Sequence, residues 1–228
     1  MKYKNIIFDL DNTLLNFDIA EDKALEKIIK DFNLEYNEET LQIYRSINRP
    51  LWRKLESGEL SRDEVFDNRF PLFLKEFGIE TKGNATELKF REYLALFGTE
   101  ELPNARFILE ELKKLNCNIY LATNGFSDVQ NKRLKNSHFD TLFDDVFISE
   151  SIGFDKPDVN FFNHIFEKLN IEDKSTFLMI GDNESSDIKG ANNSNIDSVL
   201  YNPGKTNVKT NATYIISDLK EILTIVED

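Results

Sequence analysis

Four short segments, far apart in the chain, place reactive side chains at the end of an apolar run or beside a turn. Together they supply two adjacent carboxylates, a hydroxyl and an amide, one lysine and a second carboxylate pair: Asp9 and Asp11, Thr123 and Asn124, Lys156, Asp182 and Asp187. Carboxylate oxygens suit Mg²⁺, and an ammonium can neutralise a phosphoryl group. Phosphoryl transfer beside Mg²⁺ needs this inventory, so the residue types predict an enzyme.

The first acid pair follows a buried strand pattern. Asp9 and Asp11 come directly after the apolar residues 6–8, with Thr13 two residues further on. Ligands of open parallel sheets bind at the carboxyl ends of the strands, which favours a functional interpretation. The alternative is that both acids simply end the strand.

A hydroxyl and an amide end the second apolar run in the same way. Thr123 and Asn124 are followed by Gly125, and together they can hold phosphate oxygens through side chains and backbone N–H groups. Taken alone, this segment also fits an ordinary Asn-Gly turn. Its interpretation therefore depends on the other three segments.

The lysine and the second acid pair complete the set. Lys156 precedes Pro157, which disfavours helix at the lysine and favours an extended backbone there. Asp182 follows an apolar run and would lie beside Asp9 if the two strands are neighbours, with Asp187 five residues further on. A loop lysine on the surface is the alternative for Lys156.

The rest of the chain alternates short apolar runs with helical patterns, which indicates a parallel sheet covered on both faces. We expect a Rossmann-like α/β fold with five strands in the spatial order 3-2-1-4-5. The predicted strands are Asn5–Leu10, Asn118–Thr123, Asp145–Ser149, Thr176–Gly181 and Ser198–Tyr201, and the predicted helices are Asn104–Asn116, Asn160–Leu169 and Ser217–Val226.

Residues 17–97 break this alternation and read as four consecutive helices: Ile19–Phe32, Glu38–Leu55, Ser61–Phe77 and Asn84–Phe97. We therefore predict a catalytic core made of residues 1–16 and 98–228, with an inserted all-helical cap domain at 17–97. Because the insert begins just after the first acid pair, it can act as a lid over that pair.

Composition excludes several classes of protein. The formal charge is −13, from 28 basic and 41 acidic residues, which disfavours binding to a nucleic-acid polymer but leaves a small phosphate ester possible. The single cysteine excludes an internal disulfide and a cysteine zinc site. No apolar run is long enough for a membrane helix and the first residues form a strand pattern. We expect a cytoplasmic protein with no membrane partner, as a monomer or weak homodimer.

In this order, the four segments resemble the motifs of the haloacid dehalogenase superfamily of phosphatases. The D-x-D-x-T, Thr, Lys-Pro and G-D-x4-D motifs are all present, the match spans essentially the whole chain, and the insert resembles the small cap of subfamily I. The resemblance implies Mg²⁺ as cofactor and hydrolysis through an aspartyl-phosphate.

The resemblance also implies roles for individual residues. Asp9 would be the nucleophile, and Asp11 the general acid and base, whose backbone carbonyl would also bind Mg²⁺. Asp182 would ligate the metal and Asp187 would ligate or orient it. Phosphate oxygens would be held by Thr123, Asn124 and Lys156, so the implied catalytic set is Asp9, Asp11, Thr123 and Lys156, and the implied metal set is Asp9, Asp11, Asp182 and Asp187.

The substrate is less sharply indicated. Three segments resemble the 5′-nucleotidase branch of subfamily I: residues 16–17, 44–52 and 124–126. Members of that branch act on pyrimidine and non-standard nucleoside monophosphates. The resemblance gives five candidate substrate residues: Asn16, Phe17, Asn48, Trp52 and Phe126. A planar base could stack on Trp52 or Phe17, which contributes ~1–3 kcal/mol per base. The alternative is that Trp52 packs within its helix bundle.

Other functions share the same core. A phosphoglycolate or sugar-phosphate phosphatase, or a phosphomutase, would differ in the cap pocket. A catalytically quiet regulator that binds phosphate or Mg²⁺ is the non-enzyme alternative, although such a protein would typically have lost one of the four motif residues Asp9, Asp11, Lys156 or Asp182.

Overall fold

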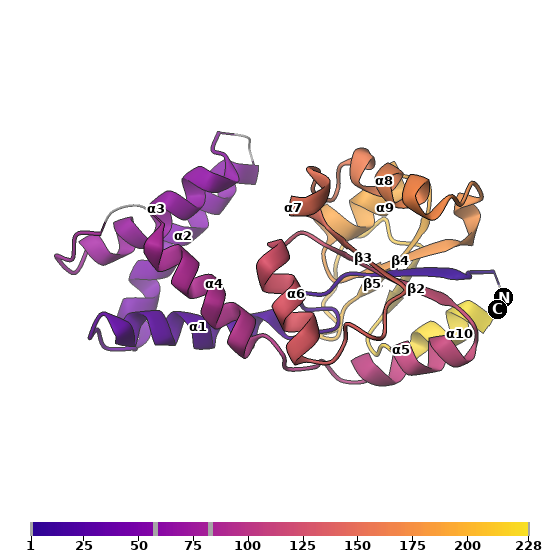
Figure 1. Cartoon of the computed structure of the whole chain (residues 1–228), viewed down its shortest axis with the longest axis horizontal. Helices are drawn as coiled ribbons and strands as arrows, with labels where there is room; N and C mark the ends of the chain where they lie inside the picture. The colour runs from indigo at the N-terminus through magenta and orange to yellow at the C-terminus, as the bar shows by residue number, and fades with distance from the viewer. Residues whose placement is uncertain (1, 57–58, 82–83, 228) are drawn as a thin grey trace. The chain divides into compact units, whose positions relative to one another are not determined.

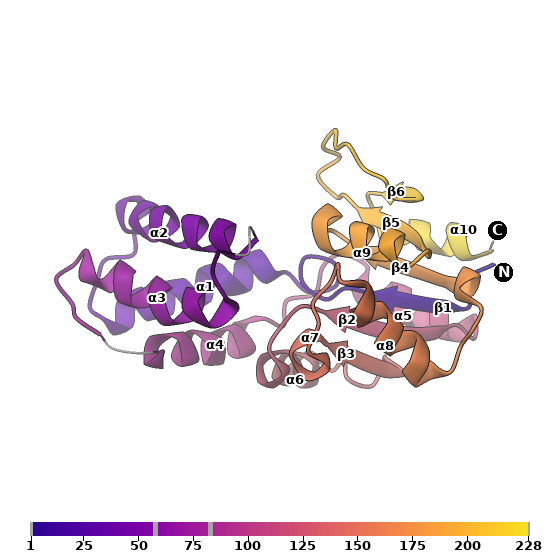
Figure 2. The same cartoon turned by 90° about the horizontal axis from the view of Figure 1, so that it is seen from above.

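A computed structural model describes residues 2–56, 59–81 and 84–227 of the chain. Close contacts divide it into two compact units, Met1–Ile19 with Gly98–Asp228 and Ala20–Phe97. The first unit is built on a six-stranded sheet in the order β3-β2-β1-β4-β5-β6 (Figures 1 and 2). All neighbouring strands run parallel. The strands are β1 (Asn5–Phe8), β2 (Asn118–Thr123), β3 (Asp145–Ile148), β4 (Phe177–Gly181), β5 (Asp197–Tyr201) and β6 (Tyr214–Ile216).

Helices cover both faces of this sheet. They are α5 (Ala105–Lys114), α6 (Ser127–Asn136), α7 (Ser149–Ile152), α8 (Val159–Leu169), α9 (Lys189–Asn193) and α10 (Glu221–Glu227), with short 3₁₀ and π-helical turns η1 (Lys174–Thr176) and η2 (Glu184–Ile188). Buried side chains of α5, α6 and α10 belong to one core cluster, and those of α8 and α9 to another. The sheet is thus the middle of three layers.

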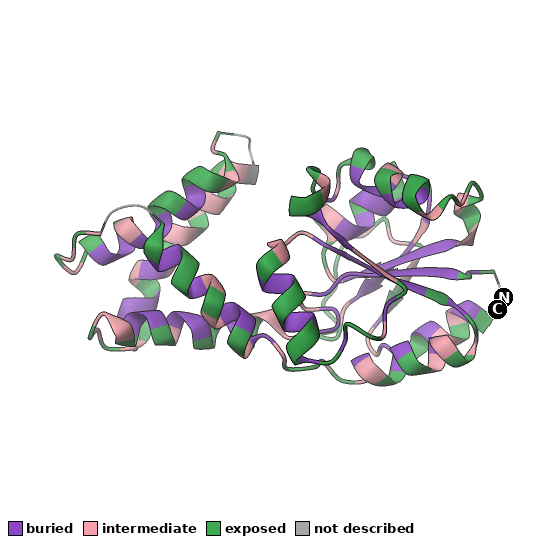
Figure 3. Ribbon diagram, viewed as in Figure 1, coloured by how far each residue is buried: buried purple, intermediate pink, exposed green. Residues whose placement is uncertain are grey.

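The two core clusters follow from strand geometry. Successive side chains of a strand point to opposite faces, so Ile6 and Phe8 enter one cluster while Ile7 enters the other. The residues of the central strand β1 are all buried (Figure 3). A strand apolar on both faces can only lie between two helical layers, which explains the near-continuous apolar runs in the sequence.

The helix α8 shows why these segments fold locally as they do. Its apolar residues recur at helical spacing, and Phe161, Phe162 and Ile165 are completely buried against the sheet. The side chain of Asp158 accepts a hydrogen bond from the backbone N–H of Asn160 and so caps the first turn.

The fold class is confirmed, with two corrections. The predicted order of five strands omitted β6, whose three residues are too few to give a clear alternating pattern. The helices α6, α7 and α9 were also missed. Of these, α7 and α9 have only four and five residues, and α6 is mostly polar and buries only Val129, Gln130, Arg133 and Leu134.

The second unit consists of helices: α1 (Phe17–Asp31), α2 (Glu38–Glu56), α3 (Arg62–Lys75) and α4 (Ala85–Phe97). Its core contains a buried ion pair in which the guanidinium of Arg69 donates two hydrogen bonds, of 2.6 and 2.8 Å, to the carboxylate of Glu87. The same guanidinium lies over the rings of Phe66, Phe70 and Phe90. The function of this unit as a cap remains a prediction.

Within the described ranges, no helix is long and apolar enough to cross a membrane.

We expect the Glu87→Gln variant to lower the free energy of unfolding by about 3–5 kcal/mol, because it removes the carboxylate that is paired with the buried guanidinium of Arg69. Urea unfolding followed through the fluorescence of Trp52, the single tryptophan, measures this. The control is Glu26→Gln, which removes an exposed partner of Lys30 and should change little. Equal effects of both substitutions would contradict a structural role for the buried pair.

Candidate active site

Strand register brings the first acid to the middle of the sheet edge. Phe8 lies opposite Leu121 of β2 and Ile180 of β4, so Asp9 emerges between the carboxyl ends of those two strands. Its backbone N–H still donates to the carbonyl of Ile180 at 2.8 Å, which extends the ladder to Asp9. The side chains that follow β2 and β4 therefore approach it from both sides.

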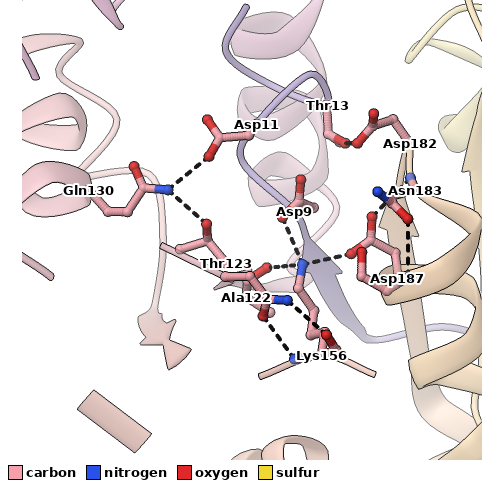
Figure 4. A network of polar contacts seen from close by, with 12 residues as sticks. Asp9, Asp11, Thr13, Ala122, Thr123, Gln130, Lys156, Asp182, Asn183 and Asp187 are labelled. Atoms are coloured by element: carbon pink, nitrogen blue, oxygen red, sulfur yellow. Dashed lines mark hydrogen bonds and ion pairs between the residues drawn. The ribbon is translucent and has the colours of Figure 1, made fainter. Parts of the chain in front are cut away.

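A buried lysine lies at the centre of this edge. The ammonium of Lys156 donates three hydrogen bonds, to Asp9 Oδ1 at 2.7 Å, Asp187 Oδ1 at 2.6 Å and the carbonyl of Ala122 at 2.7 Å (Figure 4). All three of its N–H groups are thus used. Burial alone would lower the pKa of Lys156, but the carboxylates of Asp187 and Asp9 raise it, so the side chain stays charged.

The loop that carries this lysine is fixed by Asn124. The side-chain amide of Asn124 donates to the carbonyl of Lys156 and accepts from its backbone N–H, both at 2.8 Å. The peptide bond between Lys156 and Pro157 is cis. The side chain of Asn124 thus orients the loop of the lysine, and binding of Asn124 to phosphate stays a prediction.

Three carboxylates converge beside the lysine. Oxygens of Asp9, Asp182 and Asp187 lie within 4.8 Å of one another. Burial raises the pKa of Asp9 well above its usual value, against the effect of Lys156. Burial and then the charge of Asp187 raise the pKa of Asp182 to about 7. Asp9 and Asp187 are buried and Asp182 is half-buried, and one ammonium does not balance these three carboxylates, so the cluster favours a further cation.

The loop after β4 is built so that Asp187 can reach this cluster. A Cβ on Gly181 would lie 2.1 Å from Asp187 Oδ2, so only glycine permits the approach. The same Oδ2 accepts a hydrogen bond from the backbone N–H of Asn183 at 3.1 Å. The hydroxyl of Thr13, the last residue of the first motif, donates to Asp182 Oδ1 at 3.4 Å.

Asp11 is oriented differently from the other acids. Its carboxylate turns toward α6, where Gln130 Nε2 donates to Oδ2 at 3.0 Å (Figure 4). The guanidinium of Arg133 donates to Oδ1 at 2.5 Å. Gln130 also donates to Thr123 Oγ1 at 2.9 Å, so one amide joins the first and second motifs. The side chain of Asp11 lies outside the three-carboxylate cluster, and the metal contact expected of its backbone carbonyl stays a prediction.

Sequence reasoning missed Gln130 and Arg133. They lie three residues apart, on the same buried side of α6 as Val129 and Leu134. A glutamine and an arginine at apolar-face positions of a helix directly after the second motif were the available signal, since buried polar side chains need partners.

The predicted substrate residues of the first unit have local partners. Asn16 Oδ1 accepts from the backbone N–H of Ile19 at 3.1 Å and so caps α1. Phe17 lies under the guanidinium of Arg133, 5.8 Å from its ring centre. Phe126 is half-buried at the start of α6. Contact of these residues with substrate stays a prediction.

Asn48 and Trp52 belong to α2 of the helical unit. The indole N–H of Trp52 donates to Asn48 Oδ1 at 3.0 Å, and its ring meets that of Phe66 edge-on at 6.0 Å between centroids. These contacts favour packing over base stacking for Trp52, which was the alternative stated from the sequence.

The carboxylate cluster fits a hard divalent cation. Asp9, Asp182 and Asp187 offer only oxygen ligands, and no donor within the described residues reaches Asp9 Oδ2. Few carboxylates completed by water and a phosphate are the usual ligands of protein-bound Mg²⁺. These three residues would hold such an ion.

The geometry at this sheet edge agrees with a comparison to protein families. Residues 3–195 match the haloacid dehalogenase-like hydrolase family, and the chain belongs to this family. The superfamily resemblance inferred from the four motifs is thereby confirmed.

Three relatives align along most of the chain. YfnB of Bacillus subtilis, named as a HAD-hydrolase, is 37% identical over 97% of this chain and 94% of its own. Pyrimidine 5′-nucleotidase PynA of Streptococcus pneumoniae is 36% identical over 98% and 94%, and pyrimidine 5′-nucleotidase YjjG of Escherichia coli is 32% identical over 89% and 87%. A crystal structure of YfnB bound to magnesium covers 100% of both chains with a TM-score of 0.91.

The Gly181→Ala variant should lose about tenfold or more in affinity for Mg²⁺, because the added methyl group displaces Asp187 from Lys156. Calorimetric titration with Mg²⁺ measures this. Gly204→Ala is the matched control, since its new Cβ would meet only Thr206, at 3.6 Å. Unchanged affinity in Gly181→Ala would show that Asp187 does not support a cation.

The metal-free protein should lose stability as pH rises from 3.8 to about 7, because the folded pKa of Asp182 is raised and the folded state then binds the proton more tightly than the unfolded chain. Mg²⁺ needs the carboxylate form, so it should raise the melting temperature more at pH 8 than at pH 5. Asp182→Asn should weaken both effects, whereas the exposed Asp128→Asn should keep them. An equal rise with Mg²⁺ at both pH values would contradict this charge balance.

Proposed function

We propose that this protein is a Mg²⁺-dependent phosphatase that hydrolyses a small phosphate monoester, most readily a pyrimidine nucleoside 5′-monophosphate, through an aspartyl-phosphate. The observation that carries the proposal is the buried ammonium of Lys156, bonded at once to Asp9 and Asp187 with Asp182 beside them. The two nucleotidase relatives support the substrate class.

Asp9 is the candidate nucleophile. Its Oδ1 is fixed by Lys156, while no donor from the described residues holds Oδ2, which leaves that oxygen able to attack phosphorus. In the first step the Oδ–P bond forms and the bond from phosphorus to the leaving oxygen breaks. The ammonium keeps the carboxylate in place and offsets negative charge that gathers on the phosphoryl group.

Asp11 is the candidate general acid and base. It gives a proton to the leaving oxygen in the first step. In the second step water attacks phosphorus, Asp11 takes the proton of that water, and the P–O bond to Asp9 breaks. Inorganic phosphate leaves and both carboxyl groups return to their first state.

Thr123 is the candidate residue for holding a phosphoryl oxygen. Its hydroxyl oxygen accepts from Gln130, so its own proton is available to a phosphate. The cation, held by Asp9, Asp182 and Asp187, would supply charge neutralisation and alignment of the phosphate with the attacking carboxylate. Two side chains of the protein set the geometry: Lys156 aligns Asp9, and Asn124 aligns Lys156.

Replacement of the nucleophile tests the chemistry. Asp9→Asn should lower Mg²⁺-dependent release of phosphate from p-nitrophenyl phosphate by about a thousandfold or more, because an amide forms no acyl phosphate. Circular dichroism should show an intact fold, and Asp128→Asn on the exposed start of α6 should keep wild-type activity. A fully active Asp9→Asn variant would remove Asp9 from this role.

The substrate class is tested separately with the wild-type protein. We expect kcat/KM to be higher for pyrimidine nucleoside 5′-monophosphates than for purine counterparts, sugar phosphates or phosphoglycolate. A preference for phosphoglycolate or a sugar phosphate would replace the nucleotidase assignment but keep the phosphatase. Transfer of phosphate between two positions of a sugar, without release of inorganic phosphate, would indicate a mutase.

A further inference from the structure

The carboxylate of Asp11 is held by two side chains that lie outside the four sequence motifs. Gln130 and Arg133 of α6 each bind one of its oxygens, and they are only 2% and 1% exposed. Lys156, the other long charged side chain that is this deeply buried among the described residues of the first unit, belongs to the site itself. Burial of a glutamine and an arginine is costly unless their groups are paired, so a specific task is indicated.

The amide of Gln130 has one possible orientation. Its Nε2 donates to Asp11 and to Thr123, while its Oε1 accepts from the guanidinium of Arg133 at 2.8 Å. A reversed amide would set an oxygen against the Asp11 carboxylate and a nitrogen against the guanidinium. Arg133 thus fixes Gln130, and both fix Asp11.

The second motif leaves room for this contact. A Cβ on Gly125 would lie 2.5 Å from Gln130 Nε2, so a larger residue would push the amide away. The close approach of the Gln130 side chain therefore explains the glycine after Thr123 and Asn124. This steric observation supports the contact independently of the hydrogen bonds.

Arg133 also binds the two chain segments at the borders of the first unit. Its Nε donates to the carbonyl of Gly98 at 2.9 Å, and its guanidinium lies over the ring of Phe17. Gly98 begins the second stretch of that unit and Phe17 lies near the end of the first. One guanidinium therefore ties Asp11 to both borders.

We propose that Gln130 and Arg133 are positioning residues for the general acid and base, and that their task is to fix the carboxylate of Asp11. This inference rests on the proposed phosphatase function. An Asp side chain without these contacts rotates among several positions, and a proton donor acts only where it reaches the leaving oxygen. The two residues would thus act through Asp11 and touch no reacting atom.

A comparison of kcat/KM among esters whose leaving groups differ in acidity distinguishes this positioning role from a general structural role. An alkoxide leaving group, as in a nucleoside monophosphate, needs the proton of Asp11, whereas a nitrophenolate leaves without one. The ratio kcat/KM reports the first step, up to formation of the aspartyl-phosphate. Loss of positioning should therefore lower kcat/KM for alkyl esters far more than for activated aryl esters.

The experiment compares Gln130→Met, Arg133→Met and Arg133→Lys with the wild type. We expect kcat/KM to fall about tenfold or more for a nucleoside monophosphate and for phenyl phosphate, but less than about threefold for p-nitrophenyl phosphate. Arg133→Lys should recover part of the loss. Lys132→Met removes an exposed cation from the same helix and is the matched control.

A double variant identifies the route of the effect. In an Asp11→Asn background, Gln130→Met should add little further loss for the alkyl ester, since the residue acts through Asp11. Full additivity, or equal losses for all leaving groups, would overturn the proposal in favour of a structural role. Gly125→Ala should show the same dependence of kcat/KM on the leaving group as Gln130→Met. It replaces the Arg133 variants in the test if those fail to fold.

The outcomes separate this inference from the proposed function. A wild-type protein that hydrolyses no phosphate ester with Mg²⁺ would remove the phosphatase itself. An active wild type whose Gln130→Met variant turns over the alkyl ester equally well or faster would leave the phosphatase and overturn only the positioning role.

Discussion

The buried ammonium of Lys156 is the interaction on which the rest of the site depends. It has three N–H groups, and each is used by a different segment: the end of β1, the end of β2 and the loop after β4. A charged group this deeply buried is tolerated only when its partners are in place. The lysine therefore fixes where Asp9 and Asp187 lie, and Asn124 in turn fixes the lysine.

Charge balance explains why the same sheet edge suits phosphate and a cation together. The four motif carboxylates, Asp9, Asp11, Asp182 and Asp187, are matched inside the described core by Lys156 and Arg133 alone. Burial and then the negative charge of Asp187 raise the pKa of Asp182, and the unbalanced negative charge would repel a phosphate ester. A divalent cation reverses that sign locally, and this effect is stronger in a partly dehydrated site than in water.

Much of this arrangement could be predicted from the sequence because parallel strands are locally encoded. Apolar runs fix the strands, and strand ends share one edge of the sheet, so residues 9, 123 and 182 were expected to lie together. The cap boundaries rested only on where helical patterns begin and end. Side-chain partners across the fold were harder: neither the pairing of Asn124 with the backbone of Lys156 nor the contacts of Gln130 follow from any local pattern.

The helix α6 shows a physical limit on predicting helices from hydrophobic periodicity. Periodicity finds a helix through its apolar face, but the buried face of α6 carries Gln130 and Arg133 beside Val129 and Leu134. The polar residues lie there because they serve Asp11, so a functional requirement hides the structural pattern.

The two acids of the first motif illustrate how environment divides labour between like groups. Asp9 and Asp11 are two residues apart, yet one is bound by an ammonium among other carboxylates and the other by an amide and a guanidinium. Different surroundings are what give paired carboxylates different roles in catalysis. In this chain the difference arises from topology: Asp9 follows the strand end between β2 and β4, whereas Asp11, two residues further on, turns its carboxylate toward α6. The nucleophile and the proton carrier that we propose thus lie two positions apart but in different surroundings.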